Sequence, residues 1–363
     1  MRIQSIDYLR GVMALSVVFY HVAFIFGRWG VMDSGTILGR FGIYAVSAFY
    51  VISGMALYLA HKNSKWDLSA YGFFMLKRFL RLAPVYWVAL CLLTYLTYKF
   101  SILTIDPWSY LQNIFLTFGV TSPTGYIVMG GWSIGNEIVF YLFFPFFILM
   151  ARNRYMLLIL SLFSAALFLY CATMHLDSDK PFGWQWSQYI NPLNQVYFFI
   201  FGIISARILL PYVGRRKALC SCFALLLLFL FVARDVGGDL INIITGTEKV
   251  FFTTITLMLC SSFFLMGDLR EIKPIHYILK FLGDISYPIY LLHGTTFIFV
   301  KKLFVTNSTP NSTVIIYAAS TIALLMLASW LCHIAIERPM LKLSKHLPNI
   351  KIPVIKTGAA HHH

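Results

Sequence analysis

Ten apolar runs of membrane-spanning length constrain this chain more than any other feature of its sequence. A transmembrane helix needs about 20 predominantly apolar residues to cross the hydrocarbon core, and a continuous apolar stretch of that length indicates such a helix. We therefore predict an all-α polytopic membrane protein with about ten transmembrane helices. The runs lie at 6–27, 41–60, 82–100, 132–150, 155–173, 191–210, 218–234, 249–267, 283–304 and 313–334.

Composition supports this class and excludes an ordinary soluble protein. Of the 363 residues, 59% are hydrophobic and 12% are charged, whereas soluble domains average about 45–50% and 25%. The net charge of +15 does not indicate nucleic-acid binding, because the basic residues lie in short loops between apolar runs. Basic residues in such loops indicate which side of the membrane each loop occupies. With the N-terminus in the cytoplasm, 21 of the 29 Lys and Arg residues fall on the inner side. Both termini are therefore predicted to be cytoplasmic.

The chain shows no internal repeat and no separate soluble segment. We treat 1–345 as one transmembrane domain and 346–363 as a cytoplasmic tail that ends in a residual tag. The segment 108–120 is apolar but too short to cross comfortably, so we expect it to be re-entrant or interfacial. The first run is not followed by a small-residue cleavage site, which favours a retained helix over a signal peptide. The six cysteines have no metal-ligand spacing with histidine, and we expect neither a disulfide framework nor a metal site.

Three ionisable residues, Asp7, Arg10 and His21, lie in the first apolar run. Such a side chain in hydrocarbon costs roughly 2.5 kcal/mol or more, so it usually faces a bundle interior or a wet cavity. At about 100° per residue, Arg10 and His21 fall within roughly 20° of each other on the helix surface, and Asp7 lies close by. The alternative is that Arg10 reaches the interface and His21 makes one buried hydrogen bond.

The run 131–141 supplies a carboxylate, Glu137, near the outer end of the fourth span. In the predicted topology His21 also lies in the outer half, so the two residues belong to the same layer. An imidazole whose tautomer is fixed by a carboxylate makes a general base at neutral pH. We therefore predict Glu137, or Asp7, as the partner of His21. The alternative is that Glu137 pairs structurally with an arginine.

Basic residues also stand before the third span, where Lys77, Arg78 and Arg81 occur together. Arg78 and Arg81 share a helix face, and guanidinium groups suit phosphates. The alternative is positive-inside anchoring of the helix. His293, close to Tyr287 and Tyr290 in the ninth span, is either a cavity residue or a satisfied core histidine.

Four stretches together resemble the membrane-bound acyltransferase 3 family. They are I-D-Y-L-R-G with Tyr20-His21, F-Y-V-I-S-G at 49–54, K-R-F-L-R-L-A-P-V-Y-W with its R-x-x-R pair, and W-S-I-G-N-E-I-V-F-Y from Trp132. Two further stretches agree with this resemblance, namely I-S-Y-P-I-Y-L-L-H before Gly294 and I-E-R-P at 336–339. The match extends from about 3 to 341, and its specificity comes from the order and spacing of the motifs. One departure is that Gly135 and Val139 stand where Ser and Gln are common.

The resemblance implies an enzyme that moves an acyl group, usually acetyl, from cytoplasmic acyl-CoA to a hydroxyl of an envelope carbohydrate or lipid-linked glycan, such as an O-antigen. It implies a multi-pass protein of the bacterial inner membrane, in contact with lipid. Some members carry an added SGNH-type esterase domain, for which we expect no room after the last helix of this chain. We expect neither nucleic acid nor a metal as a partner. Arg10 and His21 would be essential, and Arg78 and Arg81, with Lys77, would bind the donor. The other expected site residues are Glu137 and Asp7 for catalysis and Trp132, Ser133, Tyr141 and His293 for the substrate.

A transporter or flippase of a polar envelope metabolite is the competing hypothesis, with Arg, His and Glu lining a substrate path. It predicts inverted repeats and matching interrupted helices, which the sequence does not show.

Overall fold

The computed structural model describes residues 3–27, 33–102 and 104–346, and the regular secondary structure assigned within them is helical. This confirms the predicted all-α class. A helix of at least 14 residues overlaps each predicted span. These helices are α1 (Gln4–Phe26), α2 (Ile37–His61), α3 (Leu68–Phe100), α6 (Gly131–Arg152), α7 (Arg154–Thr173), α9 (Val196–Leu209), α10 (Lys217–Ala233), α12 (Gly246–Met266), α13 (Lys273–Phe304) and α14 (Asn311–Cys332).

Shorter elements connect or extend these helices. They are α4 (Pro107–Phe115), α5 (Phe118–Thr121), α8 (Trp186–Tyr189), α11 (Ile241–Ile244), α15 (Arg338–His346), the 3₁₀ turns η1 (Phe182–Gln185), η2 (Pro192–Asn194) and η3 (Leu210–Tyr212), and the π-helical turn η4 (His333–Glu337). The segment 108–120 thus forms two short helices, α4 and α5, neither of which is long enough to cross a bilayer. Most of the predicted tail, 347–363, lies outside the described residues.

Within the described ranges, seven helices are long and apolar enough to cross a membrane. They are α1, α2, α3, α6, α7, α12 and the run Asn311–His346 that joins α14 to α15. Helices α9 and α10 are apolar but shorter. Helix α13 has 32 residues and falls outside this group; it carries Lys280, Asp284 and His293. The protein is therefore a multi-pass helical membrane protein, and the number of ten spans stays a prediction.

Helices α3 and α13 begin well before the apolar runs that predicted them. Helix α3 starts at Leu68, where the Asp67 side chain accepts a 2.7 Å hydrogen bond from the Ala70 N–H and caps the helix. A charged residue interrupts an apolar run but leaves the backbone hydrogen bonds of a helix intact. As a result Arg78 and Arg81 lie inside α3 and not at its start, which corrects the predicted position of this group.

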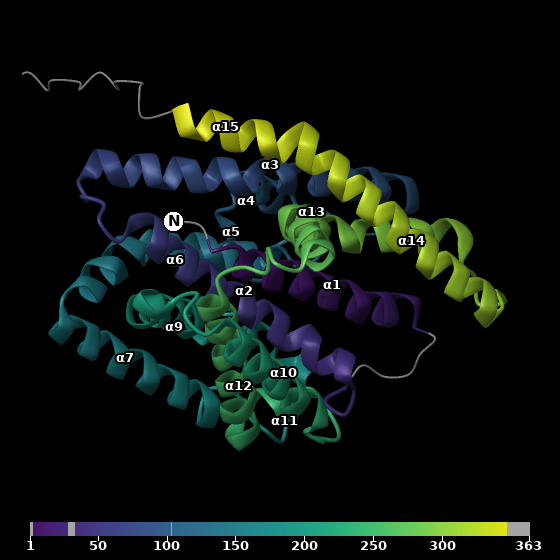
Figure 1. Cartoon of the computed structure of the whole chain (residues 1–363). Coiled ribbons are helices and arrows are strands. Elements are labelled where there is room, and N and C mark those ends of the chain that lie inside the picture. Colours follow the sequence, from purple (N-terminus) through teal and green to yellow (C-terminus); the bar gives the residue numbers. More distant parts are fainter. Residues whose placement is uncertain (1–2, 28–32, 103, 347–363) are drawn as a thin grey trace, which may run out of the picture.

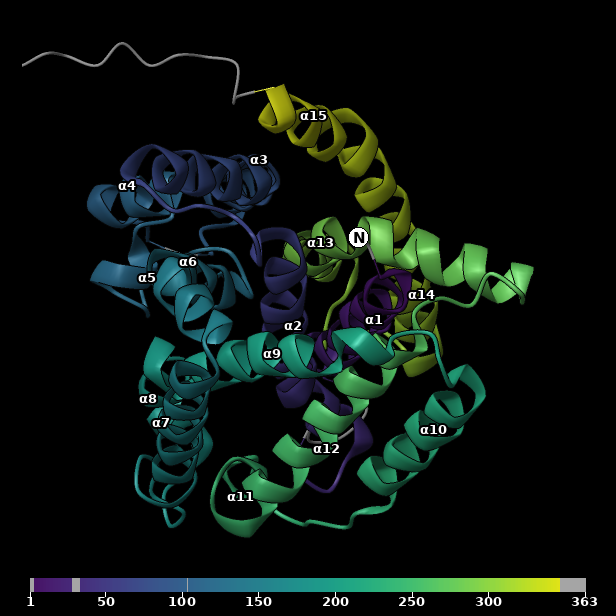
Figure 2. The ribbon, with the colours of Figure 1, turned by 60° about the vertical axis from the view of Figure 1, so that its left-hand side comes forward.

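Helix α1 lies in the interior of the molecule, against α13 and α2 (Figures 1 and 2). Glycines allow the close crossing of α1 and α13, since a Cβ on Gly11 would lie 2.7 Å from the Gly283 nitrogen. Small residues at such crossings let two helix backbones approach within a membrane. The crossing places the face of α1 that carries Arg10 and His21 next to α13.

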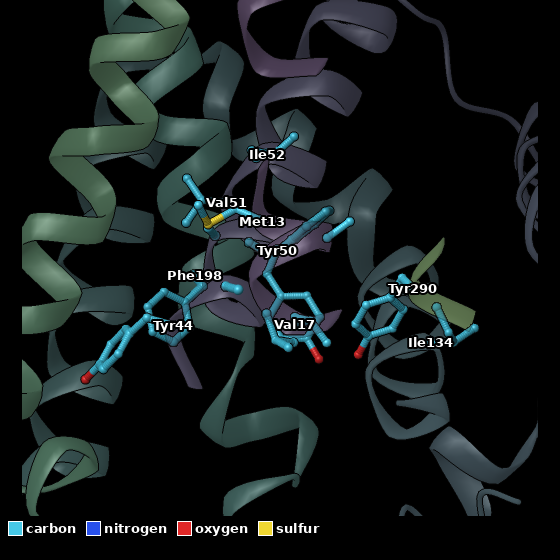
Figure 3. Packing of buried hydrophobic residues seen from close by; sticks show 14 of the residues in the cluster. Met13, Val17, Tyr44, Tyr50, Val51, Ile52, Ile134, Phe198 and Tyr290 are labelled. Atoms are coloured by element: carbon cyan, nitrogen blue, oxygen red, sulfur yellow. The ribbon is translucent and has the colours of Figure 1, made fainter. Parts of the chain in front are cut away.

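Buried apolar side chains from several helices fill the space around α1 and α2 (Figure 3). Met13 and Val17 of α1 pack in the same cluster as Tyr50 and Val51 of α2 and Ile134 of α6, and each of these residues is at most 4% exposed. Tightly packed interiors hold backbones in fixed positions. This core therefore gives a rigid frame to the polar side chains described next.

Candidate active site

A central cavity of about 170 Å³ lies among α1, α2, α3, α6 and α13. Its walls combine apolar and aromatic groups with a small set of charged and hydroxyl side chains, which is the usual make-up of a ligand site. The polar lining residues are Arg10, Tyr50, Ser53, Arg78, Arg81, Ser133, Glu137, Tyr141, Ser286, Tyr287 and Tyr290.

A larger entrance cavity of about 500 Å³ is formed by α1, α2, α3, α13, the π-helical turn η4 and α15. Six basic side chains and three acidic ones line it, so the cavity has a positive excess that suits an anionic ligand. The basic residues are Arg10, Arg81, Lys280, Arg338, Lys342 and Lys345, and the acidic ones are Asp7, Asp284 and Glu337.

The two cavities adjoin. Arg10 and Arg81 line both of them, together with Ala56, Ala60, Ser286 and Tyr287. An elongated ligand that entered the larger cavity would therefore meet two guanidinium groups before it reached the central one.

The three arginines of the central cavity differ in their partners. Arg10 Nη1 lies 2.9 Å from Asp7 Oδ1. Arg78 and Arg81 make no hydrogen bond or ion pair with another residue of the described ranges; the Arg78 Nε is buried without a partner and the guanidinium lies 5.6 Å from the Phe74 ring centroid. A buried charge without a partner is costly. Arg78 thus has an unpaired buried N–H, and both guanidinium groups face a cavity in which an anion could pair with them.

Glu137 lies in the same cavity and binds Tyr141, whose hydroxyl donates a 2.6 Å hydrogen bond to Glu137 Oε2. The Tyr141 hydroxyl is also 3.5 Å from Ser53 Oγ. Glu137 therefore adds a negative charge among the three arginines without forming a direct salt bridge to them in the described structure.

His21 is oriented by its own helix. Its Nδ1 lies 3.0 Å from the Val17 carbonyl oxygen, and because a carbonyl only accepts, Nδ1 carries the proton and Nε2 presents its lone pair. The predicted pairing of His21 with Glu137 or Asp7 is not observed, since these carboxylates bind Tyr141 and Arg10. Instead, the ring of His21 lies 4.7 Å from the ring of His293 on α13, centroid to centroid.

The residues predicted to contact the substrate occupy different environments. Ser133 and Tyr141 line the central cavity, and Ser133 Oγ lies 2.8 Å from the Tyr290 hydroxyl. Trp132 packs instead in an aromatic cluster. Its ring centroid lies 5.7 Å from that of Trp186 and 5.8 Å from that of Tyr189.

Lys77, His21 and His293 lie outside the lining residues of both cavities. For Lys77, the structure therefore provides no contact with the space that an anionic donor would fill. The His293 ring lies 5.9 Å, centroid to centroid, from the ring of Tyr290, which lines the central cavity.

Gly135, where the family commonly has Ser, has a packing role in this chain. A Cβ at this position would lie 2.6 Å from the Phe118 ring and 2.9 Å from the Gly119 Cα. The glycine thus permits α5 to pack directly on α6. A serine here would force the two helices apart, which gives a physical reason for the departure.

The C-terminal segment contributes site residues that the sequence did not predict. One face of α15 lines the entrance cavity. It carries three basic residues at helical spacing, Arg338, Lys342 and Lys345. They follow η4, in which His333 Nδ1 lies 2.7 Å from Glu337 Oε2. Single π-helical turns inside helices often occur at functional sites. The spacing was visible in the sequence, but the same residues also fit a topology signal.

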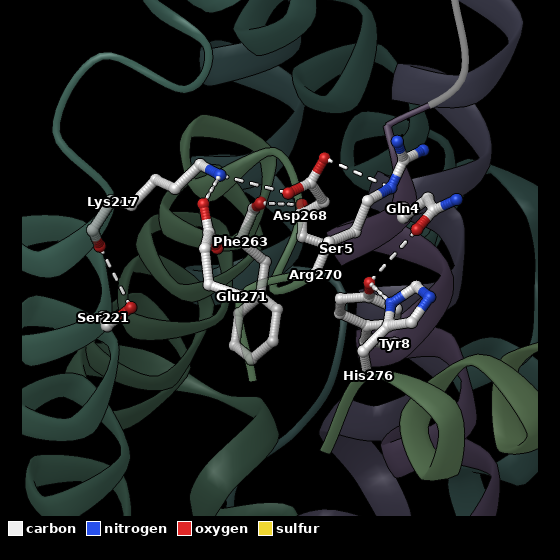
Figure 4. Close-up of polar contacts among 10 residues, drawn as sticks. All are labelled: Gln4, Ser5, Tyr8, Lys217, Ser221, Phe263, Asp268, Arg270, Glu271 and His276. Carbon is white, nitrogen blue, oxygen red and sulfur yellow. Dashed lines mark hydrogen bonds and ion pairs between the residues drawn. The ribbon is translucent and has the colours of Figure 1, made fainter. Parts of the chain in front are cut away.

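A second basic cluster, formed by Lys217 and Arg270, is paired with acids (Figure 4), and neither residue lines either cavity. Lys217 Nζ lies 3.1 Å from Asp268 Oδ1 and 2.7 Å from Glu271 Oε1, and Arg270 Nε is 3.7 Å from Asp268 Oδ2. The hydrogen bond from Lys217 lowers the pKa of the Glu271 carboxyl. This arrangement satisfies its own charges and leaves no need for a ligand.

Among the described residues, no group of three or more His, Cys, Asp or Glu side chains could hold a metal ion. The lining of the two cavities offers four arginines, three lysines, the His333 imidazole, four carboxylates and several hydroxyls, and the imidazoles of His21 and His293 lie outside it. These groups can bind an anion and move a proton.

Comparison with known proteins agrees with this arrangement. A family model described as an acyltransferase domain matches residues 3–333, nearly the whole chain. Neither the comparison with curated proteins nor the comparison with solved structures found a match. With its helices, its adjoining cavities and this match, the chain belongs to the acyltransferase 3 family of membrane acyltransferases.

Proposed function

We propose that this membrane acyltransferase moves an acyl group, normally acetyl, from cytoplasmic acyl-CoA to a hydroxyl of an envelope carbohydrate or lipid-linked glycan in the bacterial inner membrane. The observation that carries the proposal is the wall shared by the two cavities, where Arg10 and Arg81 face both. One elongated ligand could therefore occupy the larger, positively charged cavity and the smaller central cavity together.

The donor fits this route by its charge and shape. Coenzyme A carries several phosphate charges at one end and an extended arm with the thioester at the other. Guanidinium groups bind phosphates through paired hydrogen bonds, so Arg10 and Arg81, with the lysines and Arg338 of the entrance cavity, would hold the phosphates. The arm would then extend into the central cavity, past Tyr287, with Arg78 beside it.

His21 supplies the base in this proposal. Its Nε2 lone pair takes the proton of the acceptor hydroxyl while the hydroxyl oxygen attacks the thioester carbonyl carbon. The carbon–sulfur bond then breaks, and the proton passes from His21 to the departing thiolate, which leaves as free coenzyme A. A route through acyl-His21 would use the same atom as the nucleophile.

The acceptor would reach the site from the outer side of the membrane. In the predicted topology α1 runs outward, so Arg10 lies near the cytoplasm and His21 about 16 Å further out at 1.5 Å per residue. Acyl transfer at His21 would therefore modify a glycan on the side opposite to the donor, as in acetylation of an O-antigen or another surface polysaccharide.

The test is His21→Ala in a strain that lacks the native gene. Alkali-labile acetate released from the envelope is measured by mass spectrometry, because it reports O-acetyl esters without requiring a named acceptor. Loss of a positioned base should reduce the acetate formed by about 10²- to 10⁴-fold. Calorimetric titration with acetyl-CoA should give an unchanged dissociation constant, because the imidazole does not contact the nucleotide.

Wild-type turnover by a folded His21→Ala protein would exclude His21 as the base. A wild-type protein that adds no acetate and consumes no acetyl-CoA would favour the transporter hypothesis instead.

A further inference from the structure

We propose that His293 is a positioning residue for the base: its Nε2 accepts the Nε2–H of His21 once His21 has taken the acceptor's proton. The inference rests on the proposed acyl transfer and extends it to a residue that lines neither cavity. Its starting point is the pair of imidazoles that α1 and α13 bring together.

The tautomer of His293 follows from the hydrogen bond that its Nδ1 makes to the backbone. His293 is completely buried, and its Nδ1 lies 2.6 Å from the Tyr290 carbonyl oxygen. Because the carbonyl can only accept, Nδ1 carries the proton and Nε2 is a free acceptor. This Nε2 has no hydrogen-bond partner within the described part of the chain.

An unpartnered acceptor inside a protein is unusual and costs free energy. The neighbouring rings cannot supply a donor, since Phe297 lies 6.1 Å and Tyr290 lies 5.9 Å from His293, centroid to centroid, and the Tyr290 hydroxyl is bound to Ser133 and Gly130. The resting enzyme thus keeps an acceptor ready for a donor that is absent from the resting state.

His21 becomes that donor during the reaction. In the resting state both histidines present Nε2 lone pairs, so no hydrogen bond can form between these two atoms. When His21 accepts the hydroxyl proton, its Nε2 becomes an N–H group and its ring becomes positively charged. The ring centroids lie 4.7 Å apart, a separation that one N–H···N hydrogen bond between two imidazoles can bridge while each Nδ1 keeps its backbone carbonyl.

The interaction therefore exists only after the proton has moved. Groups that bind more strongly in the transition state than in the ground state accelerate a reaction, and a fixed acceptor in a dry site is most effective for a developing charge. The proton is shared between the two Nε2 atoms and then passes to the coenzyme A thiolate. The close crossing at Gly11 and Gly283 sets the distance between the helices that carry the pair.

Two substitutions separate this role from simple core packing. His293→Gln keeps a hydrogen-bond acceptor at the position of Nε2, whereas His293→Leu fills the space without one. His276→Gln is the matched control, because His276 lies on the same helix and binds the Tyr8 hydroxyl away from both cavities.

The measurement uses inside-out membrane vesicles that contain the enzyme and its native acceptor, with [14C]acetyl-CoA as the probe and alkali-labile label as the readout. We expect His293→Leu to lower kcat about 100-fold with the KM for acetyl-CoA changed by less than about threefold, since the lost interaction forms only after binding. His293→Gln should recover at least about tenfold of that loss through its acceptor. His276→Gln should behave as the wild type.

Equal activities of His293→Leu and the wild type would overturn the inference, and so would equal losses in His293→Leu and His293→Gln. Protein amount and thermal unfolding in detergent are measured for each variant, so that a misfolded variant is recognised as support for a packing role. Wild-type vesicles that incorporate no more label than vesicles without the protein would instead refute the proposed acyl transfer itself.

Discussion

The arginines of the central cavity and the Lys217 cluster are both basic groups, yet they differ in how their charges are satisfied. Lys217 holds two carboxylates within 3.1 Å, and about a third of its side chain is exposed. Arg78 and Arg81 face a cavity, and neither forms a hydrogen bond or ion pair with another residue of the described ranges. The same positive-inside tendency accounts for both groups in the sequence.

The difference separates structural charge from functional charge. A basic residue that anchors a helix can use water, lipid phosphates or a nearby acid, as Lys217 does with Asp268 and Glu271. A guanidinium enclosed by helices lacks these partners and pays a desolvation penalty until an anion arrives. Exposure to a cavity together with the missing partner, and not charge alone, is therefore the reason why we propose these arginines for donor binding.

Topology gives the sharpest test, because both clusters should lie on the cytoplasmic side. Cysteines introduced by Ser178→Cys and Asn307→Cys should react completely with an impermeant thiol reagent added outside intact cells, and those from Ser64→Cys and Ser344→Cys should not. The background would lack Cys91 and Cys222, which are exposed. The reverse pattern would place His21 in the cytoplasmic half of the membrane.

Removal of a cavity arginine should have a large effect on activity. Arg81 faces both cavities, and a hydrogen bond to a charged group contributes about 1.5–3 kcal/mol. We expect Arg81→Ala to lower kcat/KM for acetyl-CoA by about 10- to 100-fold. The matched variant Lys217→Ala should retain wild-type kinetics. If both variants lost activity equally, the distinction between the two clusters would fail.

Replacement of the cavity arginines by lysine tests geometry at constant charge. If Arg78 and Arg81 only anchored α3, Arg78→Lys/Arg81→Lys would be almost silent, whereas paired phosphate contacts need the guanidinium fork. We expect the acetyl-CoA dissociation constant to rise about tenfold, roughly 1.4 kcal/mol. The loss should be smaller for dephospho-CoA, which lacks the 3′-phosphate.

Calorimetric titration of both ligands at one salt concentration measures this effect, since exposed charges are screened by salt. Equal affinities of the wild type and the double variant would return both arginines to membrane anchoring.

The Lys217 cluster should contribute only a small, pH-dependent stability. Its hydrogen bond lowers the folded-state pKa of Glu271, so the stabilisation is present above the ordinary carboxyl pKa and disappears as the pH falls through the folded value. We expect Lys217→Ala to lower the Tm by about 1–3 °C at pH 7, as for an exposed ion pair. The difference from wild type should shrink at about pH 3. A constant difference across this range would exclude the carboxylate pairing as its cause.

The periodicity of single helices made several features predictable from the sequence. The apolar runs predicted the long helices, because length and hydrophobicity act within one segment. Helical spacing also placed Arg10 and His21 on one face of α1, and the structure directs both toward α13. The pair Arg78 and Arg81 was recognised in the same way, although α3 starts earlier than its apolar run.

The tertiary structure alone decided which helices these faces meet. It placed His293 beside His21, brought Arg338, Lys342 and Lys345 to the entrance cavity, and gave Glu137 to Tyr141 and not to His21. The contact between Glu137 and Tyr141 joins positions four residues apart on one helix and so agrees with local spacing. The other contacts do not follow from it, because each joins positions whose distance depends on how helices cross. In a membrane the crossing is set by close packing of small residues, as at Gly11 and Gly283, and a sequence does not state which of its glycines will meet.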